Sequence, residues 1–194
     1  MSDLRERALI RIDAVHADDP VRALDGRGRE LVYAEHMSRW LDRLAPDASD
    51  ALRLAVRAQH LARWRSPREA FPEGRVGYLE WRKAAGERHA SDVRALLVDV
   101  GFDEAFATRV ATLVMKKART RDPESQLLED CACLVFLELD YEAFVAKHED
   151  DAKVIDIVKK TWGKMSPRAR EEAMKIGLVG RGAALVARAL AVAS

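Results

Sequence analysis

The sequence predicts an all-α protein, folded as a single compact multi-helix domain over residues 1–194. Apolar residues recur at helical spacing along nearly the whole chain, Ser, Asp and Pro stand where helices would begin, and no segment shows the alternation of a half-buried strand. Of the 194 residues, 48% are hydrophobic and 34% are charged, which leaves enough apolar side chains for a core.

The first two predicted helices cover most of the chain up to Pro46. The first begins at Ser2 and ends in the loop 16–20, and the second follows the turn at residues 25–28. His36 lies on a stripe of the second helix that is otherwise apolar. We therefore expect the His36 side chain to face the core.

The third predicted helix brings a second histidine into the core. Asp47 or Ser49 caps it, and its apolar positions recur at every fourth residue as far as Trp64, with His60 among them. The segment 66–77 that follows holds two prolines, two glycines and two arginines. This composition predicts an irregular loop of the kind that often carries function.

The middle of the chain predicts three further helices. The helix over residues 78–100 has His89 on its apolar face, and Asp103 caps the next one. Asp122 caps a helix that leads into the longest apolar run, residues 131–137. A helix that is apolar on all sides is buried, so carboxylates at the start of this run need partners.

The last third predicts three shorter amphipathic helices and a tail of small residues. The helices cover residues 141–148, 150–165 and 167–176. The sequence contains no internal repeat and no low-complexity segment, which favours one domain.

The charge and the apolar content exclude several classes of protein. With 33 Lys and Arg against 32 Asp and Glu, the net charge is +1, unlike that of a protein that coats nucleic acid or a membrane surface. Its apolar runs are too short to cross a bilayer, and Cys131 and Cys133 are spaced unfavourably for a mutual disulfide. We therefore expect a soluble cytoplasmic protein with reduced thiols in its core.

Imidazole and carboxylate groups from four predicted helices are candidates for one interior site. We interpret His36, His60, His89 and Asp130 as ligands of a divalent metal ion, Mn, Fe, Zn, Ni or Mg not being distinguishable. We predict catalytic roles for Asp130 and for its neighbour Glu129, as general base or as a residue that orients a ligand. The alternative is that each histidine is a core residue bonded to ordinary neighbours.

Basic and aromatic residues gather between Arg57 and Arg88, beside two of these candidate ligands. Arginine offers a planar fork for phosphate, and aromatic rings offer a stacking surface for a base. We therefore expect a small phosphorylated molecule as the partner and favour nucleic acid less. The candidate substrate-binding residues are Arg63, Trp64, Arg68, Arg75, Tyr78, Arg82 and Lys116. The alternative is an ion-paired, solvated face with its aromatic rings in the core.

Several segments of the chain resemble the family of domain of unknown function 4202. They are Gln-His-Leu-Ala-Arg-Trp at 59–64, Ser-Pro-Arg at 66–68, Pro-Glu-Gly-Arg at 72–75, Gly-Tyr-Leu-Glu-Trp-Arg at 77–82, residues 129–137, and Lys-Thr-Trp at 160–162. The resemblance covers nearly the whole chain, but it brings no established activity.

A more remote resemblance concerns the order His36, His60 and Asp130. It is similar to the order of ligands in the HD-domain superfamily, all-helical metal-dependent phosphohydrolases whose implied set is a His, a His-Asp pair and a late Asp. Leu61 stands where the paired Asp would be, and the sequence contains no His-Asp dipeptide. Either His89 replaces the missing ligand or the site has lost its metal, and both alternatives stay open.

Two functions of different classes follow from these observations. The first is a metal-dependent phosphohydrolase of HD-like architecture that acts on a small nucleotide-type phosphoester, with a metal-bound hydroxide as nucleophile. The second is a non-catalytic helical module that binds a phosphorylated ligand or RNA through the Arg57 to Arg88 region. The sequence predicts no membrane partner and does not define the oligomeric state.

Overall fold

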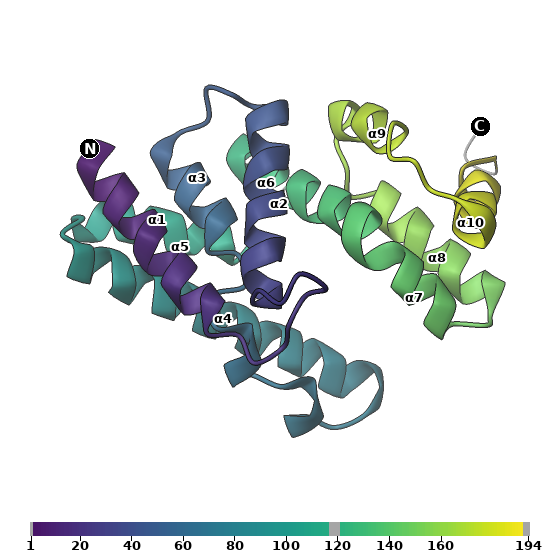
Figure 1. Ribbon diagram of the computed structural model, residues 1–194, viewed down its shortest axis with the longest axis horizontal. Coiled ribbons are helices and arrows are strands. Elements are labelled where there is room, and N and C mark those ends of the chain that lie inside the picture. Colours follow the sequence, from purple (N-terminus) through teal and green to yellow (C-terminus); the bar gives the residue numbers. More distant parts are fainter. Residues whose placement is uncertain (1, 117–120, 192–194) are drawn as a thin grey trace. The chain divides into compact units, whose positions relative to one another are not determined.

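Helices account for the regular structure of the residues that the computed structural model describes, 2–116 and 121–191, and these ranges contain no strand (Figure 1). The all-α prediction is therefore confirmed. In chain order the elements are α1 (Ser2–Ala17), α2 (Arg29–Leu44), α3 (Asp50–Arg57), η1 (Arg63–Arg65), η2 (Arg68–Ala70), α4 (Gly74–Val100), α5 (Glu104–Val114), α6 (Pro123–Val135), η3 (Phe136–Asp140), α7 (Tyr141–Lys147), α8 (Asp151–Trp162), α9 (Pro167–Ala173) and α10 (Gly180–Ala191).

The chain divides into two compact units, Met1–Leu128 and Glu129–Ser194. In the first unit, α4 packs along α5, α3 contacts both α2 and α5, and α1 contacts α2, α3 and α4 (Figure 1). Side chains such as Ile12, Met37, Leu54, Val93 and Val110 fill the space between these helices and are fully buried. The expectation of one domain over the whole chain stays a prediction.

Several helices begin where the sequence places a capping side chain. The hydroxyl of Ser49 accepts a hydrogen bond from the Leu52 amide over 3.1 Å at the start of α3. The carboxylate of Asp103 accepts one from the Phe106 amide over 2.8 Å at the start of α5. Because such caps satisfy amides that have no partner within the helix, they define these boundaries locally.

The end of α3 differs from the prediction. The helix ends at Arg57, and a turn over residues 58–62 leads to η1, so the prediction of a helix through Trp64 is wrong. Ala62 takes up the left-handed conformation, with a φ of 52°, which a continuous α-helix does not allow. His60 consequently reaches the interior from a turn, where its exposure no longer follows a helical stripe.

The segment expected to be a loop folds back on the start of α4. The guanidinium of Arg68 donates hydrogen bonds to the carbonyls of Phe71 and Pro72 over 3.0 and 2.8 Å. Helix α4 already begins at Gly74, and a Cβ at Gly77 would overlap the Pro72 carbonyl. The close approach of this loop to the first turn of α4 therefore requires glycine at position 77.

The second unit is built on residues 129–135 of α6, on η3 and α7, and on α8 and α10, which contact each other. Tyr141 is fully buried, and its hydroxyl donates a hydrogen bond to the Gly182 carbonyl of α10 over 3.1 Å. Cys131 and Cys133 are buried and form no disulfide, as expected. Among the described residues, no helix is both long enough and apolar enough to span a membrane.

Candidate anion-binding cleft

A cleft of about 230 Å³ opens on the first unit between the turn after α3, the first half of α4 and the end of α5. Twelve residues line it: Gln59, His60, Arg63, Tyr78, Trp81, Arg82, Ala85, Gly86, His89, Val114, Met115 and Lys116. Three of these residues are cations, and none of the described lining residues is acidic. The composition of the wall therefore favours an anionic ligand.

His60 lies between a buried carboxylate and a guanidinium. Its Nδ1 is 3.1 Å from Oε2 of Glu30, and Nη1 of Arg63 is 3.1 Å from its Nε2 and 3.3 Å from its Nδ1. The ring of Tyr33 stacks on the imidazole with 4.4 Å between centroids. Because an ionised carboxylate only accepts hydrogen bonds, we assign the proton to Nδ1, which leaves Nε2 as the ring nitrogen that accepts a hydrogen bond from Arg63.

Glu30 is the buried member of this arrangement. It sits in the first turn of α2, where its backbone amide donates a hydrogen bond to Asp19 over 2.9 Å. Burial raises the pKa of Glu30, and the guanidinium groups of Arg63 and Arg29, 4.0 and 3.8 Å away, oppose that rise. A carboxylate held so close to an imidazole favours one ring orientation.

The two imidazoles of the cleft are uncharged at neutral pH. Burial, followed by the charges of Arg63 and Lys116, lowers the pKa of His60 well below its usual range. Burial also lowers the pKa of His89 to about 3, with His60 and Arg63 adding to the effect. The two ring centroids are 5.9 Å apart. Both side chains are therefore available as hydrogen-bonding groups or bases and not as cations.

Two buried polar atoms of the lining lack hydrogen-bond partners among the described residues. They are Nε2 of His89 and Oε1 of Gln59, on side chains whose residues are only 5% and 6% exposed. A buried polar atom without a partner costs roughly 1–3 kcal/mol. A polar ligand that reaches these atoms recovers part of that free energy, so they indicate a place where a ligand binds.

Aromatic rings stand beside the cations. The guanidinium of Arg63 lies 5.3 Å from the centroid of the Trp81 ring, and Tyr78 lies 5.8 Å from the same ring. The indole Nε1 of Trp81 donates a hydrogen bond to the Ser66 carbonyl over 2.8 Å, which fixes the plane of the ring. A planar group entering the cleft next to a bound anion would meet this aromatic surface.

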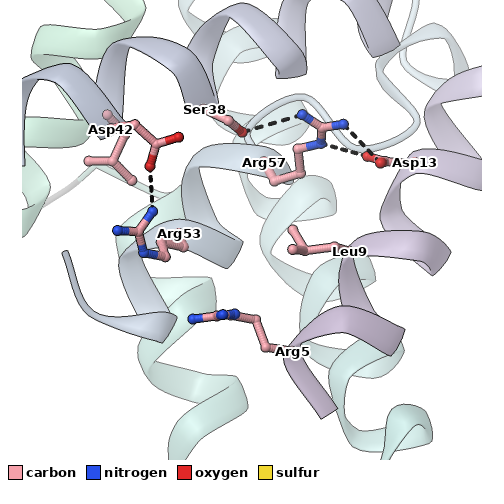
Figure 2. A pocket seen from close by; sticks show the side chains of 8 residues that line it. Arg5, Leu9, Asp13, Ser38, Asp42, Arg53 and Arg57 are labelled. Carbon is pink, nitrogen blue, oxygen red and sulfur yellow. Dashed lines mark hydrogen bonds and ion pairs between the residues drawn. The ribbon is translucent and has the colours of Figure 1, made fainter. Parts of the chain in front are cut away.

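A larger cleft of about 450 Å³ lies between α1, α2 and α3, but its charges are already paired. Figure 2 shows Arg57 bonded to Asp13 and to Ser38, and Arg53 bonded to Asp42. Arg5, which also lines this cleft, is paired with Asp50 over 2.5 Å. Each arginine here is 2.5 Å from a carboxylate oxygen, whereas Arg63 of the first cleft is 4.0 Å from Glu30, so this cleft attracts an anion less than the first one does.

Comparison with known protein families gives one match. A profile of the family described as domain of unknown function (DUF4202) matches residues 6–186. The chain belongs to this family. No curated protein and no solved structure matches the chain. The architecture described above is therefore that of a DUF4202 protein.

Six residues predicted for a site in this DUF4202 chain lie together in the cleft. They are His60 and His89 from the predicted metal ligands, and Arg63, Tyr78, Arg82 and Lys116 from the predicted substrate-binding set. Their convergence depends on the turn after α3 lying against the first half of α4. That part of the site could be expected from the composition of the Arg57 to Arg88 segment.

Three other predicted substrate-binding residues are not among the described residues that line the cleft. Arg68 is bonded to backbone carbonyls of its own loop, and Arg75 is exposed at the start of α4. Trp64 is half-buried in η1. The structure thus gives Arg68 a part in shaping the loop.

The remaining predicted metal ligands and catalytic residues have other contacts. His36 does not line the cleft, and its Nδ1 is 2.7 Å from the guanidinium of Arg39. Asp130 and Glu129 belong to the second unit, where Asp130 accepts a hydrogen bond from the Ser166 amide over 2.8 Å and Glu129 is 3.6 Å from Lys164.

A metal site is not assembled by the described residues. Within residues 2–116 and 121–191, no three His, Cys, Asp or Glu side chains form a group that could hold a metal ion. The structure brings two of the four predicted ligands together, His60 and His89, and the four-ligand site stays a prediction.

Sequence reasoning missed two titratable residues beside the cleft, Glu30 and His16. Both are buried, and each interacts electrostatically with the other. Glu30 extends the stripe that continues with Ala34 and Met37, and His16 extends the stripe of Ala8 and Ile12 in α1. Helical periodicity therefore contained the signal for both, at the ends of the helices where polar residues are usually exposed.

Proposed function

We propose that the cleft of the first unit binds a small phosphorylated molecule of nucleotide type. The observation that carries this proposal is the position of Arg63, Arg82 and Lys116 around a cleft without acidic lining residues among those described. Guanidinium and ammonium groups bind phosphate through charge-assisted hydrogen bonds, about twice as strong as neutral ones. The rings of Trp81 and Tyr78 would complete the binding surface by contacting the planar part of the ligand.

Arg63 is the residue that should respond most to the ligand. In the structure it donates a hydrogen bond to the neutral imidazole of His60. A phosphate dianion is a stronger acceptor than a neutral ring, so binding would transfer this hydrogen bond from His60 to phosphate. After this exchange of hydrogen bonds, the guanidinium would stay near the Trp81 ring, on which a base could stack.

Isothermal titration calorimetry with AMP, inorganic phosphate and adenosine tests the proposal. We expect AMP to bind more tightly than either fragment, and Arg63→Gln to weaken AMP binding by about 10- to 100-fold, the equivalent of one charge-assisted hydrogen bond. Arg65→Gln is the matched control, because Arg65 is exposed in the same short helix and is not among the described lining residues. Equal AMP affinity in all three proteins would place the ligand elsewhere.

The alternative of an RNA ligand uses the same charges. A short RNA with a 5′-phosphate would extend beyond a cleft of 230 Å³ and contact further cations along the Arg57 to Arg88 segment. If such an RNA binds far more tightly than AMP, and with a steep dependence on salt, RNA replaces the small molecule as ligand. We favour the small molecule because the cations converge on one cleft.

A metal-dependent phosphohydrolase is the second candidate function. The observation that favours it is the pair of neutral imidazoles, His60 and His89, with 5.9 Å between their centroids. Neutral imidazole is the form that binds Mn, Fe, Zn or Ni. The fit is incomplete, because the guanidinium of Arg63 lies within 3.3 Å of both ring nitrogens of His60 and the described residues supply no third ligand to this pair. Metal content of the untagged protein tests this candidate, and about one bound ion per chain would support it.

A cytoplasmic location is part of the same proposal. Nucleotide-type phosphates are abundant in the cytoplasm, and both cysteines are buried without a disulfide. Fractionation of cells that produce the full chain would test it, and recovery of the protein in a membrane or secreted fraction would contradict it.

A further inference from the structure

One imidazole in the cleft is arranged as a base. Nδ1 of His60 is 3.1 Å from the buried carboxylate of Glu30, whereas Nε2 is 3.1 Å from the guanidinium of Arg63, and both His60 and Arg63 line the cleft. A carboxylate behind an imidazole holds the ring in one tautomer and stabilises the imidazolium that forms when Nε2 takes a proton. Tyr33, stacked 4.4 Å away, restricts rotation of the ring.

We propose that Glu30 and His60 form a general-base pair that activates water for hydrolysis of a phosphoanhydride bound in the cleft, with Arg63 covering the base until the phosphate arrives. This inference rests on the phosphate binding proposed above and adds the reacting bond and the residues that act on it. His60 is then a catalytic residue, and Glu30 is a positioning residue that acts through it.

The proton and electron balance of the step is simple. Nε2 of His60 takes a proton from water as the water oxygen forms a bond to the terminal phosphorus. The bond from that phosphorus to the bridging oxygen breaks, and its electron pair stays on the leaving phosphate. The imidazolium of His60 later returns its proton to solvent. The products of one anhydride and one water are then inorganic phosphate and the phosphate that left.

The lining side chains favour an anhydride over an alkyl phosphoester. An alkoxide leaving group needs a proton donor, but the described lining residues include no carboxylic acid or thiol, and the other imidazole of the cleft, His89, is buried at 5% exposure. Arginine, lysine and tyrosine side chains release protons only at alkaline pH. A phosphate leaves without protonation, so ADP fits this cleft as a substrate and AMP fits it as a product or inert ligand.

Arg63 makes the base depend on the ligand. The groups that act on His60 come from every element around it: His16 of α1, Arg29 and Glu30 of α2, Arg63 of η1, His89 of α4, and Lys116 after α5. Burial is the largest cause of the lowered pKa of His60, and the Arg63 charge is the next. When phosphate takes over the hydrogen bond of Arg63, Nε2 of His60 becomes available to accept a hydrogen bond from water.

Hydrolysis of ADP by the full chain, in buffer that contains EDTA, tests the proposal. We expect phosphate release that falls by about 100- to 10,000-fold in His60→Gln, the range for loss of a general base. Glu30→Gln keeps the shape of the side chain, so phosphate release should fall less in this variant. His148→Gln is the matched control, since His148 belongs to the second unit and bonds the Phe144 carbonyl. AMP should bind to all of these variants, which shows that they are folded.

A second measurement does not depend on activity. The ¹⁵N shifts of the His60 ring, followed by NMR over a pH titration, should show a higher pKa with AMP than without it, and no such rise in Arg63→Gln. Wild-type protein that binds AMP but neither hydrolyses ADP nor shows this rise would overturn the inference and leave the binding proposal standing. Hydrolysis that appears only with a divalent ion would also overturn it, in favour of His60 as a metal ligand. Failure to bind AMP at all would remove both proposals.

Discussion

Nδ1 of His60 and Oε2 of Glu30 meet at 3.1 Å although 30 residues separate them in the sequence. Glu30 comes from the first turn of α2, and His60 comes from the turn that follows α3. The pair places a carboxylate that is only 4% exposed against an imidazole at the wall of a cationic cleft. Burying a charge of this kind costs free energy on folding, so the stability of the first unit depends on pH.

Glu30→Gln should change how stability varies with pH. Burial raises the pKa of Glu30 in the folded protein, so the stability that Glu30 contributes is present below its unfolded pKa and is lost as the pH rises through the folded value. Glutamine has no such loss. We therefore expect the free energy of unfolding of the variant, relative to wild type, to increase from pH 4 to pH 7 in urea denaturation. A constant difference across this range would contradict the prediction.

The histidines of the cleft have the opposite effect. Because the pKa of His89 is lowered from 6.5 to about 3, the unfolded chain takes up a proton below pH 6.5 and the folded chain does not. The free energy of unfolding should therefore fall on acidification by about 1.4 kcal/mol per pH unit for such a histidine. His89→Gln should reduce this slope between pH 6 and 4, as measured by denaturant unfolding. An unchanged slope would show that His89 is protonated in the folded protein.

Gly77 and Gly86 lie on the same helix and should respond oppositely to alanine. A Cβ at position 77 would overlap the Pro72 carbonyl, whereas a Cβ at position 86 would meet only Met115, at 4.0 Å. We expect Gly77→Ala to destabilise the protein by about 1–3 kcal/mol through overpacking. Gly86→Ala should stabilise it by about 0.5–1 kcal/mol, because alanine favours the helix. Thermal unfolding of the two variants checks both signs, and equal shifts would contradict the close approach of the loop.

The helices could largely be predicted from the sequence because their apolar periodicity and caps are local. Ser49 and Asp103 act as caps, and His89 faces inward from α4, as predicted. The turn at residues 58–62 could not be predicted, since Ala62 in a left-handed conformation has no typical sequence signal. His60 is therefore inward for a different reason from the predicted one.

The site was harder to predict than the fold, because it depends on which residues meet in space. The composition of one segment pointed to Arg63, Tyr78 and Arg82. It could not distinguish them from Arg68, whose guanidinium binds backbone carbonyls with the same fork that would bind phosphate. Glu30 was missed because a carboxylate in the first turn of a helix is normally a solvated residue that stabilises the helix dipole.

Arg68→Ala should loosen the loop without changing ligand binding directly. Its guanidinium donates hydrogen bonds to the Phe71 and Pro72 carbonyls, and their loss should lower the free energy of unfolding by about 1–2 kcal/mol. Limited proteolysis should also cut the segment 66–77 faster. Arg75→Ala is the matched control, because Arg75 is exposed on the adjoining first turn of α4. If Arg75→Ala lowers the free energy of unfolding by the same amount, the hydrogen bonds of Arg68 do not hold the loop.

Substitutions of Asp130 distinguish a structural role of this residue from its predicted role as a metal ligand. Its residue is 1% exposed, and its Oδ1 accepts a hydrogen bond from the amide of Ser166, the N-cap of α9. Asp130→Ala leaves that amide without its acceptor and should lower the free energy of unfolding by about 1–3 kcal/mol. Asp130→Asn keeps an oxygen at the same place and should cost less. Hydrogen exchange of the Ser166 amide, faster in Asp130→Ala than in Asp130→Asn, reports this contact directly. If instead both variants keep the wild-type exchange rate and both lose a bound divalent ion, Asp130 acts as the metal ligand predicted from the sequence.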